Sequence, residues 1–235
     1  QMLKAHMGEE DFWAGTKKYL ESHKGKSVET VDFRRALESV SGLKLQLFFD
    51  QWVYGTGYPE FKMSLSWDDK LKTAKVKIEQ KQKTDETTPI FKVKTTLEFI
   101  YPDKTKNHLD VILEEKEQTF YVPLKEKPAY ALFDRGNNIL KTLDVSLPLD
   151  MIKSQIENDT DVVTKVWSLK SLAKEATSAG LEIMVSALKS DPFWGVRAEA
   201  ATALGDTKLP AAMEALMAAL KSEKSSKVRV KICAA

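Results

Sequence analysis

Histidine is the side chain best suited to hold a metal ion or move a proton at neutral pH, and this sequence of 235 residues contains His6, His23 and His108. A hydrolytic zinc site carried by a helix needs two histidines four residues apart, a glutamate between them as general base, and a later glutamate as third ligand. No two of the three histidines have that spacing. We therefore interpret each as a solvated or structural histidine, and we expect no metal-ligating residue in this chain.

The other candidate nucleophile is Cys233, the single cysteine of the sequence. It falls on the predicted inner face of an alanine-rich helix, so we expect it to be a buried packing residue. A single cysteine excludes an intrachain disulfide and a cysteine-based zinc site. The sequence also lacks a Gly-x-Ser-x-Gly elbow, a phosphate-cradling loop and a Rossmann fingerprint. We predict no catalytic residue and no cofactor-binding residue.

Charge and composition exclude further classes of function. The 36 basic and 34 acidic residues nearly cancel and are interspersed, so we expect no nucleic-acid partner. No apolar run reaches the roughly 18 to 20 residues that a membrane-spanning helix needs, so we expect a soluble protein with no membrane partner. The sequence does not identify the cellular compartment, and the cytoplasm is slightly favoured.

Residues 1–59 have the apolar period of helices. Thr30 is the predicted N-cap of one helix and Gly42 its predicted end. A set of aromatic residues follows, and its spacing favours a helix core over a binding surface. These residues are Phe48, Phe49, Trp52, Tyr54 and Tyr58. The first eight residues look like the end of a helix and carry no signal-peptide pattern, so we expect an artificial boundary or a processing cut at Gln1.

In residues 60–148 the period changes to two, which is typical of strands. Phe61, Met63 and Leu65 begin a predicted hairpin, and its second strand continues through residues 74–78. Further strands are predicted at 90–101, 108–114, 118–124 and 129–133, with a last short one at residues 139 and 140. Six or seven strands without intervening helices predict an antiparallel β-sandwich of two sheets. The lysines that alternate with the apolar residues are expected to form the solvent-exposed face of the sandwich.

Residues 149–235 return to the helical period and contain an internal repeat. One constant shift along the sequence lays Asp191 on Glu223, Arg197 on Arg229 and Leu172 on Leu204. We interpret this as a HEAT-like α-solenoid, a stack of helix pairs that bury their apolar faces against each other. The last unit stops at Ala235 without a polar cap, so we expect this end to be cut as well.

Several segments of the N-terminal part together resemble the zinc aminopeptidase N family: residues 10–13, the Tyr19-Leu20 pair, the Asp32-Phe33 pair and above all residues 48–60, Phe-Phe-Asp-Gln-Trp-Val-Tyr-Gly-Thr-Gly-Tyr-Pro-Glu. The resemblance implies three domains. Residues 1–59 would be the helical end of a thermolysin-like catalytic domain, residues 60–148 a β-sandwich domain, and residues 149–235 the start of a HEAT-like helical domain.

The resemblance also implies a function for the parent protein. It would be a zinc-dependent aminopeptidase whose metal and catalytic glutamate lie in the missing N-terminal region, and this chain would be a non-catalytic fragment that shapes a peptide-binding chamber. Its partners would then be that catalytic region and the parent's peptide substrates. One alternative is a scaffold module of a catalytically inactive relative, and the sequence upstream of Gln1 would decide between them. Another is an unrelated sandwich followed by helical repeats.

Overall fold

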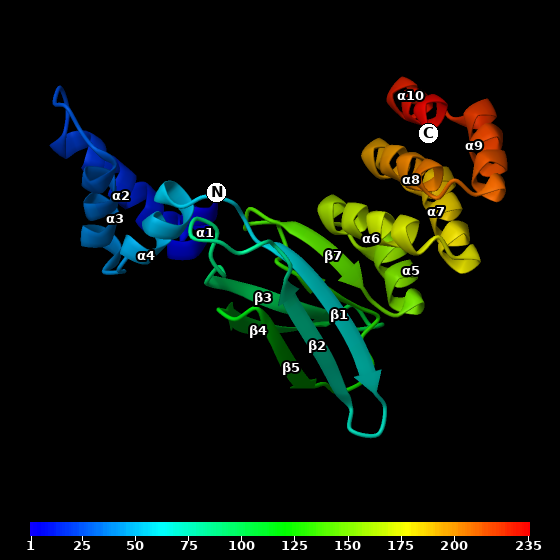
Figure 1. The fold of residues 1–235 in the computed structure, drawn as a ribbon, viewed down its shortest axis with the longest axis horizontal. Helices are drawn as coiled ribbons and strands as arrows, with labels where there is room; N and C mark the ends of the chain where they lie inside the picture. The colour runs from blue at the N-terminus through cyan, green and yellow to red at the C-terminus, as the bar shows by residue number, and fades with distance from the viewer.

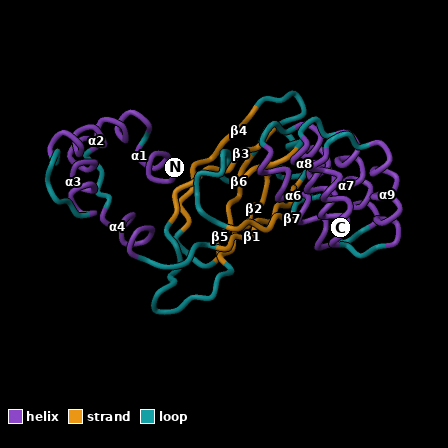
Figure 2. Tube along the Cα trace, turned by 90° about the horizontal axis from the view of Figure 1, so that it is seen from above, coloured by secondary structure: helices purple, strands orange, loops and turns teal.

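The computed structural model describes residues 1–235 as three parts in a row (Figure 1). Helices form the N-terminal part, two sheets form the middle, and a stack of helices forms the C-terminal part, so the two helical parts lie at opposite ends of the molecule (Figures 1 and 2). Strand β1 begins at Glu60 and helix α5 at Leu149. Division into domains near residues 59 and 148 stays a prediction. None of the helices combines the length and the apolar character that crossing a membrane requires.

The N-terminal part consists of short helices: α1 (Met2–Met7), α2 (Glu9–Ser22), α3 (Thr30–Ser41), α4 (Gln46–Phe49) and the π-helical turn η1 (Asp50–Tyr54). The prediction of Thr30 as an N-cap is wrong by one residue. Glu29 caps α3, because its side chain and that of Asp32 exchange hydrogen bonds with each other's backbone amides. Gly42 ends this helix in the left-handed conformation, as predicted.

Helices α2 and α3 pack closely at Gly15 and enclose a small core. A Cβ atom on Gly15 would come within 2.8 Å of the Leu37 side chain, so the approach of the two helices depends on the glycine. Four buried side chains make up this core, and they are Met7, Leu37, Leu45 and Phe49. Because the cluster is so small, the N-terminal part has little buried apolar area to stabilise it.

The middle part contains seven strands: β1 (Glu60–Asp68), β2 (Thr73–Gln80), β3 (Val93–Ile100), β4 (Lys106–Leu113), β5 (Glu117–Pro123), β6 (Tyr130–Phe133) and β7 (Thr142–Ser146). They form a four-stranded sheet of order β5-β2-β1-β7 and a three-stranded sheet of order β4-β3-β6. The predicted hairpin is β1 and β2, and the lysines of β2 lie on its more exposed face while Ala74, Val76 and Ile78 are buried.

Two details of the strand prediction are wrong. The last strand is β7, which begins at Thr142, whereas Ile139 and Leu140 lie in the preceding loop. Strand β7 pairs with β1 in parallel, with Glu60 opposite Thr142, so the sheets are not wholly antiparallel. Parallel neighbours need a long crossover, and here everything from β2 to β6 provides it. The alternating pattern of each strand fixes which face is buried, but it does not fix the partner.

The C-terminal part consists of six helices: α5 (Leu149–Asn158), α6 (Val162–Glu175), α7 (Ser178–Ser190), α8 (Trp194–Asp206), α9 (Pro210–Ser222) and α10 (Ser226–Ala234). Helix α8 packs between α6 and α10, and α7 contacts α5 and α9, so the stack has two layers. The layer of α6, α8 and α10 lies on the side of the N-terminal helices (Figure 1). The Asp191-Pro192 pair in the sequence predicts an N-cap at Asp191, but this residue lies in the turn before α8, whose N-cap is Phe193.

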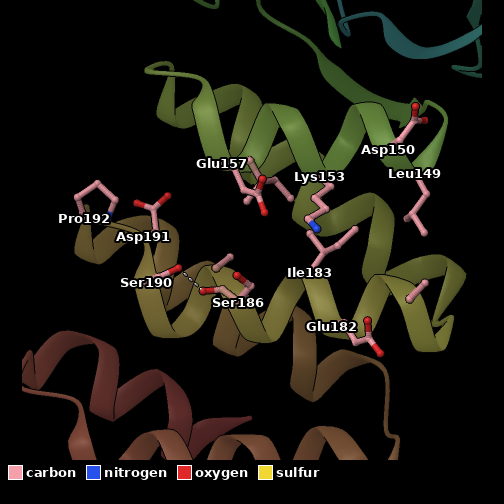
Figure 3. Close-up of a pocket in the computed structure, with 13 residues that line it drawn as sticks. Leu149, Asp150, Lys153, Glu157, Glu182, Ile183, Ser186, Ser190, Asp191 and Pro192 are labelled. Atoms are coloured by element: carbon pink, nitrogen blue, oxygen red, sulfur yellow. Dashed lines mark hydrogen bonds between the residues drawn. The ribbon is translucent and has the colours of Figure 1, made fainter. Parts of the chain in front are cut away.

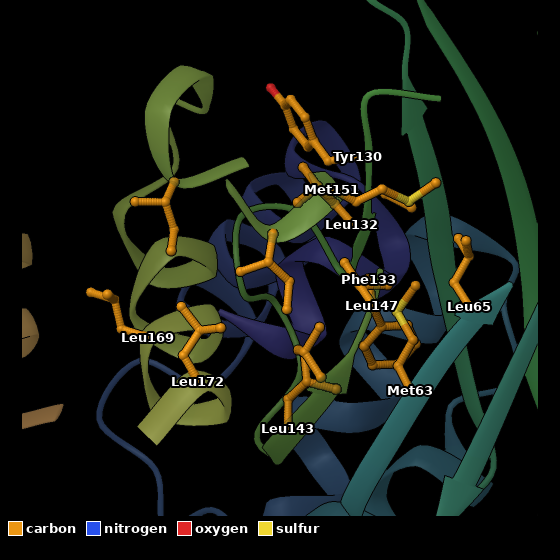
Figure 4. Close-up of a cluster of buried hydrophobic side chains, with 14 of the residues drawn as sticks. Met63, Leu65, Tyr130, Leu132, Phe133, Leu143, Leu147, Met151, Leu169 and Leu172 are labelled. Atoms are coloured by element: carbon orange, nitrogen blue, oxygen red, sulfur yellow. The ribbon is translucent and has the colours of Figure 1, made fainter. Parts of the chain in front are cut away.

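The sheets and the helical stack share one hydrophobic core. This core contains 44 buried residues, from Phe61 on β1 to Ile232 on α10. The rings of Phe61 and Phe133 meet edge to face at 5.2 Å between the two sheets. Figure 4 shows the same cluster reaching Met151 on α5 and Leu169 on α6. The first helices of the stack are therefore packed on the sheets as well as on one another.

Candidate interaction surface

The three histidines lie far from any metal-binding arrangement. His23 follows helix α2, where its Nδ1 lies 3.0 Å from the carbonyl oxygen of Tyr19. His6 and His108 both line one groove, without carboxylates grouped around them as ligands, and no cluster of three or more histidine, cysteine, aspartate or glutamate side chains could hold a metal ion. That this chain has no catalytic, cofactor-binding or metal residue stays a prediction.

The groove itself is the largest concave feature described, with a volume of about 1020 Å³. It lies between the N-terminal helices and the exposed face of the three-stranded sheet. One wall comes from α1 through Met2 and His6, and the other from α4 and η1 through Leu47, Phe48 and Trp52. These side chains bring apolar surface to both walls, beside the polar Asp50 and Gln51, and Leu47 keeps 74% of its surface exposed. The groove therefore offers an apolar lining that nothing in this chain covers.

The floor of the groove is polar because it is the outward face of strands β3 and β4. Thr96 stands opposite Asp110 and donates its hydroxyl hydrogen to that carboxylate at 3.2 Å. Glu98 stands opposite His108 in the next outward pair. The alternation of the strands points these side chains away from the core. A polar floor beneath apolar walls suits a macromolecular partner that brings both kinds of contact.

His6 is a titratable group on the wall of the groove, and its pKa is lowered there. Its ring lies 5.3 Å from the ring of Phe48, centroid to centroid. Partial burial lowers the pKa of His6, and the positive charge of Lys94 lowers it further. The imidazole is therefore neutral at pH 7. A neutral histidine in this position adds no charge to the apolar wall.

Few contacts attach the N-terminal part to the sheets. Trp52 packs on Phe91 with 5.1 Å between ring centroids. The Gln51 side chain donates to the carbonyl oxygen of Lys92 and accepts from the Lys92 amide, at 3.0 and 2.7 Å. Gln1 donates to Asn138 at 3.0 Å. These contacts link the N-terminal helices to the sheets, and Trp52 is partly buried against the shared core.

The free surface of the N-terminal helices is rich in large apolar side chains. The most exposed of them are Trp13 (56%), Leu20 (62%), Leu47 (74%), Val53 (48%) and Tyr54 (57%). The aromatic residues predicted as helix core divide accordingly: Phe49 is buried, whereas Tyr54 and Tyr58 are exposed, so the prediction is wrong for these two. A helical part with so few buried and so many exposed apolar residues has the character of a docking element.

A second, smaller pocket of about 420 Å³ lies between α5 and α7 (Figure 3). Its rim carries carboxylates, Glu157 and Glu182 among them, with Lys153 between (Figure 3). The hydroxyl of Ser190 donates to the carbonyl oxygen of Ser186 at 2.7 Å, so it is engaged within its own helix. No base stands beside a nucleophile here, and this pocket suggests no chemistry.

Polar contacts reinforce the junction between the sheets and the helical stack. Arg135, in the loop after β6, donates to Glu98 on β3 and, at 3.3 and 3.4 Å, to Asp159 in the turn between α5 and α6. The Ser171 hydroxyl on α6 donates to the carbonyl oxygen of Val145 on β7. Sequence reasoning missed both Arg135 and Asp159. A signal for Asp159 was present, because it precedes Asp191 by the same interval that separates Asp191 from Glu223.

Comparison with known proteins gives matches to both ends of the chain. Residues 1–52 match the peptidase family M1 domain. Residues 149–235 match HEAT repeats. The glutamyl aminopeptidase of Bitis rhinoceros is 39% identical over 66 residues, and a probable aminopeptidase 2 of Sulfurisphaera tokodaii is 30% identical over 101 residues. The chain is related to the M1 zinc aminopeptidases.

A solved structure has a similar fold over nearly the whole length of this chain. The aminopeptidase A of Legionella pneumophila, in complex with aspartic acid, superposes with a TM-score of 0.64 at 13% identity. The superposition covers 99% of this chain and 27% of that enzyme. The sequence matches cover 28% and 42% of this chain but only 7% and 12% of the Bitis and Sulfurisphaera proteins. The chain thus spans a small share of the length of each relative.

Proposed function

We propose that this chain is the non-catalytic C-terminal portion of a zinc-dependent, M1-type aminopeptidase, and that it supports and shapes the chamber in which peptides bind. The main support for this proposal is the order of the parts along the chain. A match to the M1 domain comes first, HEAT repeats come last, and one aminopeptidase fold covers 99% of the chain. An unrelated sheet followed by helical repeats has no reason to carry the M1 match at its start.

The order of the three parts suggests a role for each of them. The N-terminal helices are the helical end of a thermolysin-like catalytic domain, the two sheets are a β-sandwich domain, and the helical stack begins a HEAT-like solenoid. The shared core beneath both sheets supports the second assignment, since a sandwich is two sheets that bury their inner faces against each other. The ring contact of Phe61 with Phe133 lies in that interior.

The partner of the N-terminal helices is then the rest of the catalytic domain. The exposed apolar residues of α2, α4 and η1 and the uncovered groove are surfaces that such a domain would bury. Zinc and the general base would be held by that region, and the hydrolytic step would take place there. This chain would position the catalytic region and shape the peptide-binding chamber.

In this proposal the helical stack forms one wall of the chamber. Its α6, α8 and α10 layer lies on the side of the N-terminal helices, which the catalytic region would occupy (Figure 1). The shared core and the Arg135 junction fix the stack to the sheets. A wall that is fixed in this way would stay at a constant distance from the catalytic region.

A scaffold role in an inactive relative is the alternative from another class. The sequence encoded upstream of Gln1 distinguishes the two: His-Glu-x-x-His with a later glutamate supports the enzyme, and loss of that motif supports the scaffold. For the chain alone we expect no tight zinc binding and no turnover of aminoacyl substrates. Micromolar zinc affinity by calorimetry together with chelator-sensitive turnover would contradict this.

The docking surface is tested in the longer parent protein with a matched pair of charged variants. Leu47→Glu places a carboxylate on the groove wall, whereas Leu71→Glu places one on the β1–β2 turn, where the leucine is similarly exposed at 72%. We expect Leu47→Glu to lower the melting temperature and activity of the parent, and Leu71→Glu to leave both unchanged. In the isolated chain both variants should be tolerated. Equal behaviour of the two variants in the parent would argue against a partner in the groove.

A further inference from the structure

A third cavity, of about 750 Å³, lies where α5 meets the end of the three-stranded sheet. One wall comes from the turn between β3 and β4 and from the loop between β5 and β6. The other wall comes from α5 and the turn that follows it. We refer to it as the junction cavity, because it lies between the sheets and the helical stack.

Two ion pairs join the walls of the junction cavity. Lys127 donates to Asp150 at 2.6 Å, near the start of α5. Arg135 donates to Asp159 at 3.3 and 3.4 Å, directly after the end of α5. The helix rises about 13 Å between the two aspartates, so the pairs lie at opposite ends of the cavity. Because direct side-chain contacts join the walls, one small molecule between the pairs could touch both.

Tyr130 brings a free hydroxyl to this cavity. The residue is 6% exposed and its ring packs in the shared core, while Figure 4 shows the hydroxyl pointing away from the neighbouring apolar side chains. Thr95 is the only residue with a side-chain polar atom that is both fully enclosed and unpaired, so the unpaired Tyr130 hydroxyl opens on the cavity that it lines. A buried tyrosine usually finds a partner for its hydroxyl. This hydroxyl is therefore available to a ligand.

The surroundings of Tyr130 keep its hydroxyl a hydrogen-bond donor. Burial raises the pKa of Tyr130 to about 12, and the negative charge of Asp159 contributes to this shift. Arg135 opposes the shift and Glu98 adds to it. The hydroxyl therefore keeps its proton at neutral pH.

Arg135 has hydrogen-bond donors to spare beside this hydroxyl. A guanidinium carries five N–H groups, and Arg135 uses three of them, one toward Glu98 and two toward Asp159. The remaining two belong to a side chain that is 29% exposed and lines the cavity. Together with the Tyr130 hydroxyl they offer three donors. A carboxylate is the group that such a set of donors binds well.

The wall formed by α5 has the opposite chemistry. Asp150, Ser154 and Asn158 line the cavity at intervals of four residues, so they lie on one face of the helix. The side-chain oxygens of all three can accept hydrogen bonds. The Asp150 side chain pairs with Lys127 but stays 63% exposed. This wall therefore suits a positively charged donor such as an ammonium group.

The charges that line the junction cavity nearly cancel. Four cations and three carboxylates line it, and those not yet mentioned are Lys104, Lys106 and Glu126. A ligand that carries one sign of charge only would meet like charges as well as opposite ones. A zwitterion would instead place its carboxylate on the donors of one wall and its ammonium group on the acceptors of the other.

We propose that the junction cavity binds a free α-amino acid. Its carboxylate accepts hydrogen bonds from Tyr130 and Arg135, and its ammonium group donates to Asp150 and Asn158. The two ends of an α-amino acid are separated by a single carbon atom, which suits walls that are already in contact through ion pairs.

The site has a link to the groove beside the N-terminal helices. Arg135 lines both cavities, and it also donates to Glu98 on the floor of the groove. A ligand that binds Arg135 therefore touches a residue of that surface. An aminopeptidase releases free amino acids, so the ligand would be a product of the parent; this use rests on the proposed function, whereas binding to this chain does not.

The experiment titrates this chain with L-leucine and follows the backbone amides by nuclear magnetic resonance. Leucine is the probe because Ile100 and Ala129 offer apolar surface in the cavity. We expect saturable shifts centred on residues 126–130 and 154–160. N-acetyl-leucine lacks the ammonium group and leucinamide lacks the carboxylate, so each should bind about tenfold more weakly or worse. Absence of saturation, or equal affinity for either derivative, would overturn the proposal and leave the proposed function as it stands.

Three variants test the residues of the site. Tyr130→Phe keeps the ring in the core and removes the hydroxyl, so it should lower the affinity for leucine about tenfold. Tyr121→Phe is the control, because that tyrosine is 66% exposed on β5 and lies outside the cavity. Asn158→Ala should weaken binding several-fold, and since Asn158 is exposed it tests the cavity even if Tyr130→Phe changes the melting temperature. Unchanged affinity in both cavity variants would overturn the assignment.

Discussion

The N-terminal helices and the rest of the chain differ in how they are stabilised. The N-terminal part relies on a core of four buried residues, whereas the sheets and the helical stack share a core of 44. Burial of apolar surface is the main favourable term in folding, so the two regions should have very different stabilities. A region with a small core opens locally long before the global transition.

The same comparison distinguishes the two exposed apolar surfaces of the molecule. At the C-terminal end the exposed residues belong to helices that share the large core. At the N-terminal end they belong to a part whose own core is too small to stabilise it well. Docking at that end should therefore stabilise the helices that dock, and docking at the other end should leave the existing stack nearly unchanged.

The largest expected effect is in the shared core. Leu204 on α8 is fully buried, and truncating it to alanine should cost about 2 to 5 kcal/mol because a cavity remains between α8 and its neighbours. A urea titration followed by helical circular dichroism measures this loss. The exposed Lys208 is the control, and its replacement by alanine should change stability by less than about 0.5 kcal/mol. Equal midpoints for the two variants would mean that the repeat register is wrong.

A smaller and local effect is expected for Leu37→Ala. This leucine is also fully buried, but its cavity would lie in the four-residue core. Hydrogen exchange of α2 and α3 should accelerate by at least about tenfold, while the urea midpoint of the sheets stays unchanged. Leu20→Ala, at a site that is 62% exposed, should leave exchange as it is. If Leu37→Ala lowers the midpoint of the whole chain, the two regions fold as one unit.

A gain of about 1 kcal/mol is expected for Thr95→Val, on the scale of an unsatisfied buried hydroxyl. The Thr95 hydroxyl on β3 is buried without a hydrogen-bond partner, and such a group carries a desolvation cost. Valine has the same shape and removes that cost. Thr96 is the control, because its hydroxyl bonds to Asp110 and its replacement by valine should not stabilise. Thermal unfolding of both variants measures the difference, and destabilisation by Thr95→Val would show that the hydroxyl has a partner in solution.

The smallest effect concerns pH and the N-terminal part. Partial burial and Lys94 lower the pKa of His6 below its ordinary value of 6.5, so the unfolded segment binds a proton more readily than the folded one. Stability of α1 and α4 should therefore fall as pH drops from about 6.5 through the lowered pKa, and then level off. Hydrogen exchange across this window measures it. His6→Gln should remove the dependence, and a dependence that persists would point to another group.

The pattern of buried residues could be predicted from the sequence wherever it is local. The alternation of Phe61, Met63 and Leu65 predicted β1 and its buried face, and the prediction is confirmed. The match of Leu172 to Leu204 also places buried residues at equivalent positions. Period and burial are linked through the geometry of a single helix or strand, so one segment contains the information.

The features that the sequence did not predict depend on contacts between segments that are distant along the chain. Tyr58 and Cys233 have apolar character and core-like spacing, but both are exposed, so the prediction that Cys233 is a buried packing residue is wrong. The parallel pairing of β7 with β1 has no local signal. Arg135 and Asp159 meet only because the sheets and the stack come together, and no spacing rule joins a loop after a strand to a turn between helices.

The pairing of β7 with β1 has a consequence for how the protein folds. Glu60 lies beside Thr142, so the four-stranded sheet cannot close until nearly all of the intervening chain is available. Contacts between residues so distant in sequence slow folding, because the loop between them must be ordered first. During synthesis the β1–β2 hairpin forms early and keeps one bare edge until β7 emerges. We expect the helical stack, which packs on β7 through α6, to assemble on the sheets only after that late step.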